Sequence, residues 1–195
     1  MKKILVILGC VMFIFSACGK DDDSAKTEQT SVKQPAQTEV AKDKKIKDKV
    51  IDSDDDFTKM IVKNPQLFNQ EFAKFTEPQK YYFCASFAMY GLWRVKPITA
   101  SAMVNYFMGL GVAKHNVGIN DETFPAFRSG RNSCRHEALS DYIIKQKVCE
   151  VILNDAADFA NKKNYKVGDL DKRGKIEAER VLQYIKKEKL VNKAD

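Results

Sequence analysis

YYFCASFAMYGLW, residues 81–93, is apolar at nearly every position. A helix with hydrophobic residues on all sides has to be covered by other elements. Thr76-Glu77-Pro78 precedes this stretch with the residues typical of a helix start, and Lys96-Pro97 follows it as a break. We therefore predict a helix from Gln79 to about Arg94 that is the central and most buried element of the fold.

Hydrophobic residues recur with helical spacing on both sides of this stretch, and no convincing pairs of alternating strands are present. The pattern predicts an all-α fold, a single bundle of about five or six helices over residues 57–195. Gly111–Arg131 is expected to be the least regular part. The other helices are expected near Phe57, from Asn64-Pro65, from Thr99 to Gly109, as a long helix from Ser133 past Phe159, and from about Lys175 to Leu190.

The first eighteen residues, MKKILVILGCVMFIFSAC, have the pattern of a secretory signal peptide. Two lysines precede the apolar run Ile4–Phe15, which is too short to cross a membrane as a permanent helix. Phe15-Ser16-Ala17-Cys18 resembles the lipobox of bacterial lipoproteins, in which small residues precede a cysteine that becomes lipidated and N-terminal. The resemblance implies a signal peptide over residues 1–17 and a lipid anchor on Cys18.

Other interpretations of this segment remain open. Ile7-Leu8-Gly9-Cys10 also matches a lipobox, but it leaves only about six apolar residues where roughly 7–15 are usual. The remaining alternatives are an uncleaved anchor and an ordinary signal peptide cut before Cys18. In lipoproteins like those of enteric bacteria, Asp after the cysteine retains the protein at the inner membrane. Gly19 stands there, so the resemblance implies a palmitate-type anchor in the outer membrane, facing the periplasm.

Residues 18–56 are expected to form the lipidated cysteine and a disordered tether. From Gly19 to Asp56 the chain has no aromatic residue and carries 8 Lys against 11 Asp and Glu. Such a segment cannot bury enough apolar surface to fold, and as a coil it would span roughly 35 Å. The acidic cluster of Asp52 and residues 54–56 has two interpretations: a cation site, or carboxylates at the N-terminus of the first helix.

Three cysteines, Cys84, Cys134 and Cys149, remain in the chain after Cys18. An exported domain meets an oxidising compartment, so one disulfide is plausible. If Ser133 caps one continuous helix, Cys134 and Cys149 are about 22 Å apart along it, whereas a disulfide needs Cα atoms within roughly 7 Å. A bridge is therefore expected to use Cys84, with either Cys134 or Cys149, and the alternative is that all three are small core residues.

GDLDKRGKIEAER, residues 168–180, resembles the calcium loop of EF-hand and dockerin modules, with acids, a glycine and an aliphatic residue at the matching positions. The resemblance implies Asp169, Asp171 and Glu177 as calcium ligands and Gly174 as the sharp turn. Arg173 and Arg180 stand where two further oxygen ligands would be. The alternative is a helix-entry turn whose aspartates cap the last helix. No other cofactor is expected, and two histidines without paired cysteines make a zinc site improbable.

No complete catalytic set is recognisable in the sequence. Cys134 and His136 are two residues apart on the expected helix and face different directions, so they do not form a nucleophile–base pair without help from elsewhere, for instance from His115. A single carboxylate of raised pKa leaves almost no sequence signature. An envelope hydrolase for peptidoglycan or polysaccharide therefore stays open, and the candidate acids for it are Glu77, Asp121, Glu122 and Glu137.

Residues 57–195 carry 23 Lys and Arg against 15 Asp and Glu, a net charge of +8. A basic surface attracts anionic partners over long range, which in the envelope are lipid head groups, anionic polymers or an acidic protein face. Neither an RNA-binding motif nor a recognition helix is evident, so nucleic acid is not expected. The sequence favours a lipid-anchored binding or assembly module in the periplasm, with an exclusion or inhibitor lipoprotein as a special case.

Overall fold

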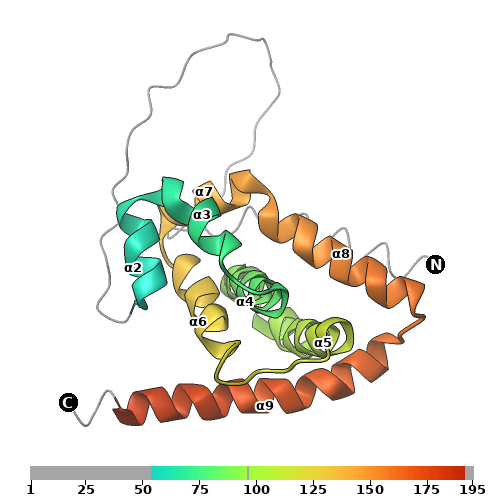
Figure 1. The fold of residues 1–195 in the computed structure, drawn as a ribbon. Coiled ribbons are helices and arrows are strands. Elements are labelled where there is room, and N and C mark those ends of the chain that lie inside the picture. Colours follow the sequence, from blue (N-terminus) through green and yellow to red (C-terminus); the bar gives the residue numbers. More distant parts are fainter. Residues whose placement is uncertain (1–53, 96, 192–195) are drawn as a thin grey trace, which may run out of the picture.

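A computed structural model of the chain describes residues 54–95 and 97–191. These residues form eight α-helices and one short 3-10 helix and contain no strand (Figure 1), so the all-α prediction is confirmed. Cys18, the expected signal peptide and nearly all of the expected tether lie outside the described residues. Among the helices of the described residues, none combines the length and the apolarity needed to cross a membrane.

The helices follow one another with short connections. In chain order they are α2 (Asp56–Lys63), the 3-10 helix η1 (Pro65–Leu67), α3 (Phe68–Ala73), α4 (Glu77–Val95), α5 (Pro97–His115), α6 (Phe124–Ser133), α7 (Glu137–Gln146), α8 (Val148–Lys162) and α9 (Val167–Val191). Figure 1 shows α4 and α5 side by side in the middle of the molecule, with α6, α8 and α9 around them.

Helix α4 is the most buried element, as its sequence predicts. Every residue from 81 to 89 is buried, and the helix packs against α5, α6 and α8. Thr76 and Gln79 form a reciprocal cap at its start: the Thr76 N–H donates to Gln79 Oε1 (2.9 Å), and the Gln79 N–H donates to Thr76 Oγ1 (3.4 Å). A disulfide between Cys84 and Cys149, with Cα atoms 4.9 Å apart, joins α4 to α8.

Helices α5 and α9 pack with their backbones in direct contact. A Cβ atom at Gly174 would lie 1.6 Å from the Asn105 carbonyl oxygen, and one at Gly109 would lie 1.8 Å from the Leu170 carbonyl oxygen. Only glycine allows so close an approach at these two positions. The two glycines therefore let the backbones of α5 and α9 approach each other closely where the helices meet.

The long helix expected from Ser133 is three elements instead. Ser133 is the last residue of α6, a turn through Cys134 follows, and α7 begins at Glu137. Lys147 then adopts a left-handed conformation (φ 57°), which ends α7 and starts α8 in a new direction. This break was not predictable from local sequence, because neither glycine nor proline marks it. Cys134 and Cys149 are therefore not on one continuous helix. The assumption of a continuous helix, which excluded their pairing, was wrong.

Two other boundaries differ from the expectation. Gly111–Arg131, expected to be irregular, contains the end of α5 and most of α6. Residues 54–56, assigned above to the tether, belong to the folded domain: Asp54 is buried, and Asp55 is the N-cap of α2, accepting from the Thr58 N–H at 3.0 Å. Of the two interpretations of the acidic cluster, the structure supports carboxylates at a helix N-terminus.

Candidate functional site

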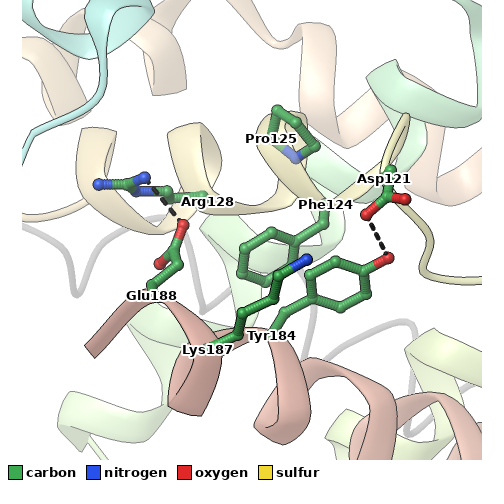
Figure 2. A pocket seen from close by; sticks show the side chains of 7 residues that line it. All are labelled: Asp121, Phe124, Pro125, Arg128, Tyr184, Lys187 and Glu188. Atoms are coloured by element: carbon green, nitrogen blue, oxygen red, sulfur yellow. Dashed lines mark hydrogen bonds and ion pairs between the residues drawn. The ribbon is translucent and has the colours of Figure 1, made fainter. Parts of the chain in front are cut away.

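A surface groove lies where the N-terminal half of α6 faces the C-terminal half of α9 (Figure 2). It encloses about 290 Å³. We call it the α6–α9 groove, and it is lined by Asp121, Phe124, Pro125, Arg128, Tyr184, Lys187 and Glu188. A concave site with an apolar floor and a few polar groups is the usual form of a ligand-binding pocket.

Two aromatic rings form the apolar floor of the groove. Phe124 and Tyr184 stack with their centroids 4.5 Å apart and their planes 18° apart. Phe124 is the first residue of α6 and is buried, while Tyr184 projects from α9 and is partly exposed. Pro125, exposed on the first turn of α6, extends the apolar lining. Stacked rings of this kind hold each other in place, so the floor is a preformed surface.

Each end of the groove is closed by a polar contact between the two sides. The Tyr184 hydroxyl donates to Asp121 Oδ1 (2.9 Å), and this hydrogen bond raises the pKa of Tyr184. Arg128 Nη1 lies 2.8 Å from Glu188 Oε1, an ion pair of two side chains that are 33% and 30% exposed. Figure 2 shows both contacts as dashed lines on either side of the rings.

Lys187 is the charged lining residue that the other side chains leave available. No hydrogen bond or ion pair joins its ammonium group to another group among the described residues, whereas Asp121, Arg128 and Glu188 are each paired. In Figure 2 its side chain extends from α9 toward the Phe124 and Tyr184 rings. The groove therefore offers one unpaired positive charge beside an apolar floor.

A second hollow of about 330 Å³ continues the groove toward α2. It shares Phe124, Pro125, Arg128 and Glu188 with the α6–α9 groove. Its other lining residues are Asp55, Asp56, Phe57, Phe75, Gln79, Ala126 and Ser129. Since the two hollows share these walls, they form one continuous surface with the Arg128–Glu188 pair between them.

The segment that carries Asp121 is fixed by the buried carboxylate of Glu177. Glu177 Oε2 accepts from the Ile119 N–H at 2.7 Å, and its Oε1 accepts from Arg180 Nη1 at 2.9 Å. Gly118 allows this, because a Cβ there would lie 2.3 Å from Glu177 Oε2. Asn120 Oδ1 then accepts from the backbone N–H groups of residues 122 and 123. The turn before α6 is therefore held by hydrogen bonds on both sides of Asp121.

The segment that resembles a calcium loop is part of helix α9, so the loop conformation is not formed. Asp169 and Asp171 are two residues apart on a helix and thus point in directions about 160° apart. Glu177 is buried and bound to the Ile119 N–H. The three expected ligands do not converge. Within the described residues, no group of three or more His, Cys, Asp and Glu side chains is arranged to hold a metal ion.

The cysteines and histidines considered for catalysis lie in separate places. Cys134 is fully buried at the end of α6. His136 is also buried, with Nε2 2.9 Å from Asp54 Oδ2. His115 lies at the end of α5 with its ring against that of Tyr81, at a centroid distance of 5.3 Å. Cys84 and Cys149 form a disulfide with each other, which is one of the two pairings that the sequence left open, and Cys134 is not a free thiol.

The four candidate acids of a hydrolase do not share a site. Glu77, Asp121, Glu122 and Glu137 are all exposed, whereas the acid of a one-carboxylate hydrolase lies in an apolar setting. Glu77 pairs with Lys80 at 2.8 Å, and Glu137 is in the first turn of α7. Only Asp121 lines the α6–α9 groove.

Most residues of the groove were not singled out by sequence reasoning. Phe124 lies in the stretch that the sequence predicts to be irregular, whereas Tyr184 and Lys187 lie in the expected last helix, some sixty residues later. No spacing rule connects them, because their meeting depends on how α6 crosses α9. No protein-family model, curated protein sequence or solved structure matches this chain.

Proposed function

We propose that this chain is a bacterial lipoprotein, anchored through Cys18 in the outer membrane, whose helical domain is a binding or assembly module facing the periplasm. The groove that runs from the α6–α9 contact to α2 carries the binding part of this proposal. It combines a preformed aromatic floor, paired charges at its margins and one unpaired lysine. These are features of a recognition surface rather than of a reacting centre.

The location rests on the lipobox resemblance of Phe15-Ser16-Ala17-Cys18 and is supported by the cysteine chemistry of the domain. Cys84 and Cys149 are both buried and bonded to each other. Structural disulfides persist in oxidising compartments such as the periplasm and are rare in the cytosol. A buried disulfide therefore agrees with an exported domain.

The partner that suits this module is an envelope protein or an anionic envelope polymer. The domain from 57 to 195 has a net charge of +8, which draws anionic partners toward it. A tether of the span expected from the sequence, roughly 35 Å, would let the groove reach partners near the membrane. A hydrolase is not favoured, since the candidate acids are dispersed and exposed.

The anchor is tested by growing the native host with a labelled fatty acid. The wild-type chain should become labelled and Cys18→Ala should not, while Cys10→Ala should keep the label. Label retained by Cys18→Ala would overturn the anchor.

The binding role is tested by photo-crosslinking in the same cells. A photoreactive phenylalanine analogue at Pro125, which is exposed in the groove, should crosslink to one discrete envelope component. The same analogue at Val151, which is 64% exposed on α8 and outside both hollows, is the matched control. Equal crosslinking at both positions, or none at Pro125, would contradict a binding role for the groove.

A further inference from the structure

We propose that the α6–α9 groove binds a peptide segment of its partner in which a carboxylate lies next to an aromatic side chain. This inference rests on the proposed function and names the class of ligand that the groove recognises. It follows from three features of the lining: the aromatic floor, the single unpaired cation, and the continuation of the groove past the Arg128–Glu188 pair.

The floor suits a flat apolar group. Phe124 and Tyr184 are stacked at 4.5 Å with nearly parallel planes, and Pro125 stands beside them. An aromatic ring of a ligand gains contact with such a surface without any rearrangement of the protein, because the two rings already hold each other. Hydrogen bonding of the Tyr184 hydroxyl to Asp121 further fixes the ring from its far end.

The charged side chains of the groove favour a ligand that carries a negative charge next to its aromatic ring. Both carboxylates of the lining are already satisfied, Asp121 by the Tyr184 hydroxyl and Glu188 by Arg128. A cationic ligand would have to compete for them. Lys187 has no partner among the described residues, so a ligand carboxylate can pair with its ammonium group and leave every existing contact intact. A charge-assisted hydrogen bond of this kind is among the stronger polar contacts.

The shape of the groove favours a chain over an isolated small molecule. The second hollow begins on the other side of the Arg128–Glu188 pair and ends at α2, where the tilted rings of Phe57 and Phe75 have their centroids 4.9 Å apart. An extended segment can place its aromatic and acidic residues in the α6–α9 groove and continue along this second surface. Extended peptides commonly bind in this way, with side chains at intervals along the peptide occupying successive pockets.

The test uses the full-length protein in lipid nanodiscs and two fluorinated probes of the same shape. These are 3-(4-fluorophenyl)propionate, an aromatic carboxylate, and 3-(4-fluorophenyl)propylamine, its cationic counterpart. Binding is followed by broadening of the ¹⁹F signal, with empty nanodiscs as the blank. We expect the carboxylate to bind with a dissociation constant of about 1 mM and the amine to bind at least tenfold more weakly.

Variants of α9 assign the effect to the groove. Lys187→Gln should weaken the carboxylate about tenfold, Lys187→Arg should restore most of it, and Lys186→Gln, a neighbouring exposed lysine outside both hollows, should change nothing. A capped Phe-Asp dipeptide should displace the probe and a capped Phe-Asn dipeptide should not. Equal binding of the two probes, or equal binding to wild type and Lys187→Gln, would overturn the proposal.

The binding role of the groove and the class of its ligand can be disproved separately. A discrete crosslink at Pro125 without preference for the carboxylate probe would overturn the ligand class and leave the binding role in place. Absence of any crosslink at Pro125 would count against the binding role itself.

Discussion

His136 Nε2 lies 2.9 Å from Asp54 Oδ2, and both side chains are buried, with exposed fractions of 3% and 2%. Asp54 is the first described residue, and His136 directly precedes α7. The contact therefore joins the segment just before α2 to the junction between α6 and α7. The next residue, Asp55, adds to this attachment by accepting from Ser129 Oγ (2.7 Å) and Asn132 Nδ2 (2.9 Å) of α6.

Three consecutive aspartates should respond to alanine substitution in a graded way. Asp54→Ala leaves a buried imidazole nitrogen without its partner, which costs about 1–3 kcal/mol. Asp55→Ala removes a helix cap and two links to α6, for a loss of about 2 kcal/mol. Asp56 is exposed in the first turn of α2, so Asp56→Ala should cost about 0.5 kcal/mol or less. Urea unfolding measures all three, and an Asp54→Ala as stable as Asp56→Ala would contradict this assignment.

Two glycines of α9 should respond to alanine with opposite signs. A Cβ at Gly174 would meet the Asn105 carbonyl oxygen at 1.6 Å, so α5 and α9 have to separate, and we expect Gly174→Ala to lower the unfolding free energy by about 2 kcal/mol or more. A Cβ at Gly168 meets nothing within 4 Å, so Gly168→Ala should stabilise the helix by about 0.5–1 kcal/mol. Thermal unfolding compares them. Similar midpoints for both variants would mean that the close contact is absent.

The segment around Gly174 was misinterpreted from the sequence, whereas the central helix was predicted correctly. Gly174 and Glu177 fit a calcium-loop pattern, but the structure uses the glycine for close helix packing and the acid to bind the Ile119 N–H. Both uses demand the same residue types as the loop, so the local pattern could not separate them. The central helix was predictable because residues 81–89 are apolar on all sides of the helix. Such a helix is stable only when other elements cover it.

Other elements depended on information that no local pattern carries. Lys147 interrupts the helical periodicity with a left-handed conformation that lysine rarely adopts. The break allows α7 and α8 to turn separate apolar faces toward the core, with Ile143 buried on one and Leu153 on the other. The groove likewise depends on the crossing of α6 and α9. Of its residues, sequence reasoning had named only Asp121, and for a different chemistry.

The disulfide should account for a large share of the stability of the domain. Cys84 and Cys149 are 65 residues apart, and closing a loop of that length restricts the unfolded chain by roughly 4 kcal/mol in the chain-entropy description. The double variant Cys84→Ala/Cys149→Ala should unfold at correspondingly lower urea. Peptide mapping without reduction should recover the two cysteines in one linked fragment. A double variant as stable as wild type, or unlinked fragments, would contradict a structural bridge.

Stability should also decline in mild acid through His115. Burial, and next the charge of Lys114, lower the pKa of His115 below its usual 6.5, although Glu77 and Asp155 act in the opposite direction. The unfolded chain therefore binds a proton more readily than the folded one. Above about pH 6.5, His115 is neutral in both states and does not change the free energy of unfolding. As the pH falls below that value toward the lowered pKa, the folded state loses stability. His115→Gln removes that proton uptake.

The measurement for His115 compares the change in unfolding free energy between two pH values in wild type and in His115→Gln. Urea unfolding of wild type and His115→Gln at pH 7.5 and pH 5.0 cancels the contributions that the two proteins share. We expect wild type to lose more stability between the two pH values than the variant, and the His115 ring protons to titrate in NMR with a midpoint below 6.5. An equal loss, with a midpoint at or above 6.5, would mean that the ring is solvated and that its contact with Tyr81 does not persist in solution.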